Sequence, residues 1–456
     1  MFQSINPFTE ELFGETSSLS HSQIEEKLSF STQAFGKWNQ MSVETRVSYV
    51  SHLMALLEEE KKNLATLITK EMGKPITQSV AEIEKCQLLC EYISKQAPVF
   101  LADQKNIPSA SSESYVIYKP LGAILGIMPW NFPFWQVFRF ALPTLLSGNV
   151  VLVKQAPNVM LCGVELEKLF VRAGFPLGIY QNLPISIEQI EKMIADSRIR
   201  GVSLTGSVKA GRAVSALAGR YLKKNVLELG GSDPYIILDS ADLEKAAREC
   251  VLSRLNNGGQ SCIAAKRLIV TKKNEKEFLS LLTREMQKYK MDDPMLPDTK
   301  LGPLARKDLR DHLHNQVEDL VKKGASILLE AKLPKNKKGY FYPPTILHTV
   351  WGSEASAFAE ELFGPVALVI TIPSEEEALF VSNASPYGLG AAVFSKDEAQ
   401  AEQWARDKIH AGSCAVNQAL HSHPALPFGG IKDSGYGREL SAWGFYEFVN
   451  IKTIFR

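Results

Sequence analysis

The sequence predicts an α/β fold with more than one domain. The chain has 456 residues, more than a single hydrophobic core usually supports, so two or three domains are expected. Residues from about 20 to 100 show helical periodicity with few Gly or Pro breaks. From Leu121 onward, short apolar runs alternate with amphipathic segments. Such alternation is typical of a parallel sheet with helical crossovers.

The apolar runs give the expected strands in order. A first set is predicted at 123–128, 150–153, 179–182, 201–204 and 226–229, with helices between them. A second alternating section begins near Tyr235, with strands predicted at 235–238, 268–271 and 367–371. It indicates a second α/β domain. Ligands of such sheets bind beyond the carboxyl ends of the strands, so the loops after these runs are the places to look for a site.

Composition and charge exclude several classes of protein. Hydrophobic residues make up 45% and charged residues 22%, as in globular proteins. The net charge of +1 provides no broad positive electrostatic field that would attract nucleic acid or an anionic membrane. No apolar stretch approaches the roughly 20 residues of a membrane span, and the N-terminus lacks a secretory signal pattern. Six cysteines are too few for a disulfide scaffold, so a cytoplasmic protein is expected.

A thiol and a carboxylate 34 residues apart carry the strongest chemical signal: Cys262 in Gly259-Gln-Ser-Cys262, and Glu228 in Leu227-Glu-Leu-Gly-Gly231. A cysteine can bond to a carbonyl carbon, and a carboxylate can activate the water that later breaks that bond. Because Glu228 ends an apolar run, desolvation can raise its pKa toward neutrality. The alternatives are an inert buried thiol and a carboxylate that only holds a loop. The pairing suggests covalent redox chemistry on an aldehyde.

Further motifs, in a fixed order, identify a family. They are Pro129-Trp-Asn-Phe-Pro133, Val153-Lys-Gln-Ala-Pro157, Glu361-Leu-Phe-Gly-Pro365 and Phe428-Gly-Gly-Ile-Lys-Asp-Ser-Gly-Tyr-Gly-Arg438. With the Glu228 and Cys262 blocks, they resemble the aldehyde dehydrogenase superfamily from one end of the chain to the other. The resemblance implies the aldehyde dehydrogenase fold, with a Rossmann-like cofactor domain at 1–110 and 121–228 and an α/β catalytic domain at 229–430.

The same resemblance implies a β oligomerisation arm formed by 111–120 and 440–456, and hence a homodimer or homotetramer. In the family these segments pair and cross to a neighbouring subunit. The alternative is a pair of edge strands within one subunit, since an unpaired edge normally has to be covered.

The resemblance also assigns catalytic roles. Cys262 is the nucleophile, and Glu228 activates water for hydrolysis of the thioacyl intermediate. The amide of Asn131 and the backbone N–H of Cys262 form the oxyanion hole, worth on the order of a few kcal/mol per donor. Asn131 lies before a helix expected to begin near Phe132, so the alternative for its side chain is a helix cap.

A glycine-rich turn is the candidate cofactor site. Leu204-Thr-Gly-Ser207 followed by Gly211 offers free N–H groups to a pyrophosphate, although it matches neither the Walker motif nor Gly-x-Gly-x-x-Gly. The residues implied to bind NADP or NAD are Pro129, Trp130, Lys154, Pro157, Thr205, Gly206, Ser207, Gly211, Leu229, Glu361 and Phe363. Strongly NAD-preferring relatives carry a Glu at the position of Pro157. Without that repulsive carboxylate both cofactors are expected to work, with a slight preference for NADP.

Substrate choice is expected to rest on Trp135 and Arg139, four residues apart on one helix face. Arg139 lies among apolar neighbours, where a guanidinium is costly unless it meets an anion. That anion is either the substrate's distal carboxylate or an internal carboxylate. The spacing resembles bacterial succinate semialdehyde dehydrogenases, in which a loop serine also often contacts the substrate. Position 419 is Ala here, which leaves a second contact open.

The expected reaction is NAD(P)-dependent oxidation of succinate semialdehyde to succinate through a Cys262 thiohemiacetal and thioacyl intermediate, with hydride passing to the nicotinamide. One alternative is oxidation of another aldehyde, either glutarate semialdehyde or a simple aliphatic one. A second is a thiol esterase or acyltransferase without redox chemistry. A third is a protein that has lost catalysis and serves as a binding or scaffold protein. No metal is expected. His421 and His423 have no partner cluster, and Cys86 and Cys90 are interpreted as core packing.

Overall fold

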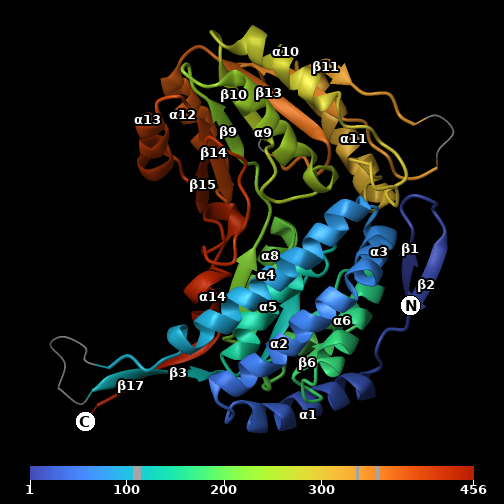
Figure 1. Ribbon diagram of the computed structural model, residues 1–456, viewed down its shortest axis with the longest axis vertical. Coiled ribbons are helices and arrows are strands. Elements are labelled where there is room, and N and C mark those ends of the chain that lie inside the picture. The colour runs from blue at the N-terminus through green and yellow to red at the C-terminus, as the bar shows by residue number, and fades with distance from the viewer. Residues whose placement is uncertain (106–113, 335–337, 355–359, 456) are drawn as a thin grey trace.

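The computed structural model describes residues 1–105, 114–334, 338–354 and 360–455. Its elements form two lobes, one around a six-stranded sheet and one around a seven-stranded sheet (Figure 1). Within the described ranges, no helix has both the length and the apolar character needed to cross a membrane.

The first hundred residues form the predicted helical layer. Its helices are α1 (His21–Trp38), α2 (Val43–Glu59), α3 (Lys61–Met72) and α4 (Ile76–Phe100). Helix α1 begins at Ser20, whose hydroxyl accepts from the backbone of Gln23 in a capping box. A hairpin precedes the layer, β1 (Phe2–Ile5) with β2 (Leu12–Thr16). The sequence analysis did not predict it, because these strands are short and mostly partly exposed.

The six-stranded sheet has the order β16-β8-β7-β4-β5-β6. Five strands are parallel and lie within two residues of their predicted positions: β4 (Ala123–Ile127), β5 (Val150–Lys154), β6 (Tyr180–Asn182), β7 (Ile199–Thr205) and β8 (Lys224–Glu228). The connecting helices include α5 (Trp135–Leu146), α6 (Met160–Arg172), α7 (Ile190–Ala195) and α8 (Val208–Arg220). Strand β16 (Gly435–Tyr436) comes from near the chain's end and pairs antiparallel with β8, placing Gly435 opposite Glu228.

The seven-stranded sheet has the order β11-β12-β13-β10-β9-β14-β15. The predicted strands correspond to β9 (Pro234–Ile237), β10 (Arg267–Thr271) and β13 (Val366–Ile372). The others are β11 (Ser326–Glu330), β12 (Thr345–Val350), β14 (Gly390–Phe394) and β15 (Ser413–Val416), with β11 antiparallel at one edge. The helices are α9 (Leu243–Leu255), α10 (Glu275–Met286), α11 (Lys307–Lys322), α12 (Glu375–Asn383) and α13 (Glu398–Gln403).

A two-stranded ribbon projects from the six-stranded lobe (Figure 1). It pairs β3 (Tyr115–Pro120) antiparallel with β17 (Val449–Ile454), which follows the short helix α14 (Ser441–Tyr446). Ile451 is 60% exposed. These are the segments expected to form an arm, although positions 111–113 and 456 lie outside the described residues. Whether the ribbon reaches a second subunit stays a prediction.

Candidate active site

Cys262 lies in the loop between a left-handed turn and β10. Asn257, Gly258 and Gly259 have φ values of 54°, 60° and 77° in succession. A Cβ on Gly259 would lie 2.1 Å from the carbonyl oxygen of Gly364, so only glycine fits. Arg254 donates to the Gly259 carbonyl at 2.5 Å. These contacts fix the position of the loop that carries the thiol.

Two cavities meet at Cys262. One has a volume of about 200 Å³ and the other about 400 Å³, and Cys262 lines both. The larger cavity also contains Glu228 and the glycine-rich turn, and the smaller contains Trp135 and Arg139. A molecule in either cavity can therefore approach the same sulfur.

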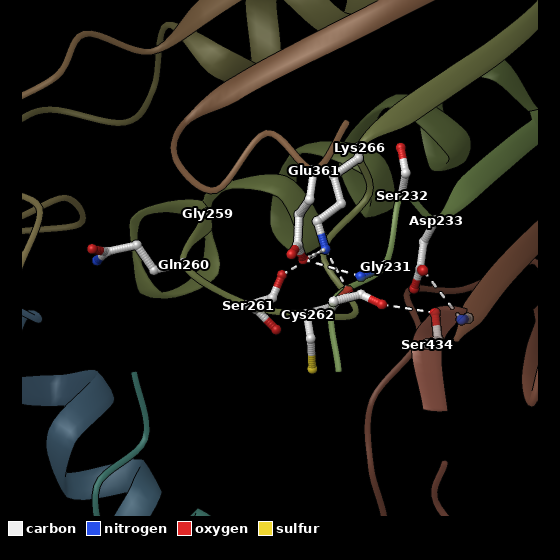
Figure 2. A network of polar contacts seen from close by, with 12 residues as sticks. Gly231, Ser232, Asp233, Gly259, Gln260, Ser261, Cys262, Lys266, Glu361 and Ser434 are labelled. Carbon is white, nitrogen blue, oxygen red and sulfur yellow. Dashed lines mark hydrogen bonds and ion pairs between the residues drawn. The ribbon is translucent and has the colours of Figure 1, made fainter. Parts of the chain in front are cut away.

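Lys266 holds the backbone around the thiol. Its ammonium donates to the carbonyl oxygens of Ser261 (2.8 Å) and Cys262 and forms an ion pair with Glu361 at 3.0 Å. Figure 2 shows the Cys262 sulfur pointing away from this cluster. Burial raises the pKa of the Cys262 thiol to about 12, while the charges of Lys266 and Arg139 act in the opposite direction. No sequence motif marked Lys266, because its contacts depend on the fold of the loop.

Asn131 lies against the loop that carries Cys262. Its side-chain amide donates to the backbone carbonyl of Gln260 at 3.1 Å, and its backbone carbonyl accepts from the Asn257 side chain at 2.8 Å. The expectation that the next helix begins near Phe132 was wrong, because α5 begins at Trp135. Asn131 does not cap that helix.

The N-terminus of α5 is capped from another helix. One carboxylate oxygen of Glu82, on α4, accepts from the backbone N–H groups of Phe134 and Trp135, at 2.9 Å and 3.0 Å. A carboxylate is favourable there because the first N–H groups of a helix have no partner within it. The Asn131 amide is thus left to face the thiol loop.

Glu228 ends β8 with its side chain buried beside the larger cavity. It is 2% exposed, and among the described residues neither of its carboxylate oxygens has a hydrogen-bond partner. Burial raises the pKa of Glu228 well above its ordinary value, with Arg139 lowering it and Glu439 raising it. A Cβ on Gly429 would lie 2.6 Å from its oxygen, so the Phe428-Gly-Gly run must pass close to the carboxylate. A buried carboxylate with a raised pKa suits a general base.

The larger cavity has the features a dinucleotide needs. Ser207 caps α8 with its hydroxyl, which accepts from Ala210 at 3.3 Å, and the Thr205 hydroxyl is buried without a partner among the described residues. The rings of Trp130 and Phe363 meet edge to face at 5.7 Å. The predicted cofactor residues that line the cavity are Pro129, Trp130, Thr205, Gly206, Ser207, Leu229, Glu361 and Phe363. A helix N-terminus beside aromatic surface fits a phosphate and a flat ring.

Three predicted cofactor residues lie outside this lining. Lys154 is the last residue of β5, and its backbone carbonyl accepts from the Met128 N–H at 2.9 Å. Lys154 therefore lies at the carboxyl ends of the strands, on the same side of the sheet as the cavity. Burial lowers the pKa of Lys154. Pro157 is exposed and starts a 3₁₀ turn. Gly211 lets α8 approach the sheet, because a Cβ there would lie 2.5 Å from a Leu229 methyl group.

Arg139 lines the smaller cavity with Trp135, as expected for residues on one helix face. Its guanidinium also forms an ion pair with Glu439, and the two side chains are 1% and 5% exposed. The guanidinium lies 4.4 Å from the centre of the Phe428 ring. Arg139 therefore has the internal carboxylate partner that the sequence analysis had considered as the alternative.

A second cation on this cavity had not been identified. Lys85 on α4 donates to the hydroxyl of Ser422 at 2.8 Å and lies 4.4 Å from the centre of the Trp135 ring. The only available signal was a lysine in an amphipathic helix, which normally indicates a solvated face. His421 also lines the cavity. Over the part of the chain that the structure describes, no cluster of His, Cys, Asp and Glu could hold a metal ion.

Comparison with known proteins identifies the family of the chain. The model of the Aldehyde dehydrogenase family matches residues 1–454. A probable succinate-semialdehyde dehydrogenase [NADP(+)] of Synechocystis sp. is 42% identical over 99% of this chain and 98% of its own. A succinate semialdehyde dehydrogenase [NAD(P)+] of Escherichia coli is 42% identical over 99% of this chain and 97% of its own.

A solved structure shows the same fold over the whole chain. The succinic semialdehyde dehydrogenase of Streptococcus pyogenes, in complex with NADP+, is 35% identical and superposes with a TM-score of 0.96 over 100% of both chains. The match covers both sheets, both cavities and the ribbon. The protein belongs to the aldehyde dehydrogenase family.

Proposed function

We propose that this protein oxidises succinate semialdehyde to succinate, using NADP or NAD. The observation that carries the proposal is the position of Cys262, which is shared by a cavity suited to a dinucleotide and a smaller cavity with basic groups. An aldehyde and a cofactor can thus reach one sulfur from two sides. The relatives named above for this reaction match the whole length of the chain.

The chain's own groups account for the covalent steps. The Cys262 thiol gives its proton to water in the cavity as its sulfur adds to the aldehyde carbon, and the Asn131 amide with the Cys262 backbone N–H stabilises the oxyanion. Bound NADP or NAD supplies the hydride acceptor. Glu228 takes a proton from the water that attacks the resulting thioester, and succinate leaves as the Cys262 thiol is restored.

Both cofactors are expected to be accepted. Lys154 supplies a cation at the strand end, and Pro157 carries no carboxylate that would repel a 2′-phosphate. The preference is expected to be slightly for NADP. NADP also appears in the names of the Synechocystis relative and the Streptococcus structure.

Two further properties belong to this proposal. The β3–β17 ribbon joins a second copy of the chain in a homodimer or homotetramer, and its exposed Ile451 and Phe455, 60% and 83% accessible, favour such a contact. The enzyme acts in the cytoplasm. Its six cysteines are all free, as suits a reducing compartment.

A substrate panel tests the proposal. Succinate semialdehyde, glutarate semialdehyde and butanal are each assayed with NAD and with NADP, following the reduced cofactor, and ester cleavage is assayed without cofactor. The highest kcat/KM is expected for succinate semialdehyde. Turnover of the other aldehydes alone, or ester cleavage without redox activity, would contradict the proposal.

A further inference from the structure

The charges around the smaller cavity are not all compensated. Arg139 is paired with Glu439, and Glu82 pairs with Lys74 while its other oxygen caps α5. Lys85 differs, since among the described residues no carboxylate forms an ion pair with it. Its one hydrogen bond is to the neutral hydroxyl of Ser422.

The setting of Lys85 suits an anion that arrives with the substrate. Its ammonium lies over the Trp135 ring, and Trp135, Ser422 and Cys262 line the same cavity. Burial and, to a smaller extent, the positive charge of Arg139 lower the pKa of Lys85 to about 8, although Cys86, Glu82 and Cys262 act in the opposite direction. A carboxylate beside the ammonium would favour its charged form and remove much of the cost of desolvation.

We propose that Lys85 binds the distal carboxylate of the substrate, with the Ser422 hydroxyl orienting its ammonium. The inference rests on the proposed function and adds a specificity residue to it. The aldehyde end then faces Cys262 and the acid end faces α4. Arg139, already neutralised by Glu439, contributes mainly to the cavity wall and to the field around Glu228.

A purely structural role is the competing explanation. Through Ser422, Lys85 ties the loop 420–428 to α4, and loss of that tie would loosen the cavity for every aldehyde. A charged and an uncharged substrate of equal length separate the two roles. Only carboxylate binding makes the effect depend on the substrate's charge.

Lys85→Met is therefore assayed with succinate semialdehyde and with butanal. We expect KM for succinate semialdehyde to rise about 10- to 100-fold, as for the loss of a hydrogen bond between charged groups, with kcat/KM for butanal within about twofold of wild type. Lys85→Arg should recover part of the loss. Ser422→Ala removes the tie but keeps the charge of Lys85, and it should raise KM for succinate semialdehyde by less than about fivefold, well below the effect of Lys85→Met. Succinate should inhibit butanal oxidation by the wild type more strongly than by Lys85→Met.

Equal losses for both aldehydes, or an unchanged KM for succinate semialdehyde, would overturn the inference. Thermal unfolding checks that the variant is folded, and Lys85→Gln replaces it if Lys85→Met is not. If the wild type does not oxidise succinate semialdehyde, the proposed function itself fails. If it does and Lys85→Met matches it, only the assignment of Lys85 fails.

Discussion

The carboxylate of Glu439 lies against the guanidinium of Arg139, and both side chains are buried. Arg139 comes from α5 and Glu439 from the loop after β16, so the pair joins segments 300 residues apart in sequence. Both residues of the pair affect the pKa of Glu228, which Arg139 lowers and Glu439 raises. The pair thus links packing of the six-stranded lobe to the carboxylate proposed as the general base.

Glu439→Gln should destabilise the protein by about 3–5 kcal/mol, because it leaves the Arg139 charge buried without a partner. Urea unfolding measures the change. The exposed pair of Arg220 and Glu191, whose side chains are 65% and 50% accessible, gives the control. Glu191→Gln should cost about 0–1 kcal/mol. Similar costs for the two variants would contradict a buried pair.

Glu228→Gln should become more stable relative to wild type as pH rises. Burial raises the folded-state pKa of Glu228 above the ordinary 4.5, so the folded state binds more protons than the unfolded state above that pH. The unfolding free energy of wild type then falls as pH rises toward the folded-state pKa, by at most about 1.4 kcal/mol per pH unit. Glutamine cannot ionise and escapes this loss.

Urea unfolding of the two proteins at pH 4, 5, 6 and 7 tests this effect. The difference in unfolding free energy between Glu228→Gln and wild type should move in favour of the variant as pH rises above 4.5. A difference that stays constant from pH 4 to pH 7 would contradict a raised Glu228 pKa.

Gly259→Ala should displace the thiol loop. The residue has a positive φ, and the new methyl group would meet the Gly364 backbone at 2.1 Å. A shift of about 1 Å in Cys262 lowers kcat/KM on the order of 100-fold. Gly219→Ala is the matched control, since Gly219 lies in α8 and a Cβ there meets nothing within 4 Å. It should leave kcat/KM unchanged and stabilise the helix by about 0.5–1 kcal/mol. Equal activity of the two variants would contradict the role of the turn.

The sequence predicted the buried parallel strands well because their signal is local. Runs such as 150–153 are apolar on both faces, as expected when helices cover both sides of a sheet. Strands β11, β12, β14 and β15 were not predicted. In β14, the sequence Gly-Ala-Ala-Val-Phe contains small residues that weaken such a pattern. The β1–β2 hairpin was missed because its residues are largely exposed.

The site residues also differ in whether their signal is local in the sequence. Cys262, Glu228 and Asn131 lie in motifs that a sequence displays directly, and the structure brings them together around one sulfur. Lys85 and Lys266 carry no such motif. Each acquires its role only when a distant segment packs beside it, Ser422 for Lys85 and Glu361 for Lys266. The pairing of Glu439 with Arg139 could not be predicted for the same reason, because the two residues are far apart in sequence.

The central claim is that Cys262 becomes acylated and that Glu228 promotes release of the acyl group. The most direct measurement is peptide mass spectrometry of Glu228→Gln after brief incubation with succinate semialdehyde and NADP, with Cys262→Ala as the control. We expect one equivalent of reduced cofactor without sustained turnover, and a succinyl group on the peptide containing Cys262. Sustained turnover by Glu228→Gln, or reduced cofactor formed with no adduct on Cys262, would contradict the account.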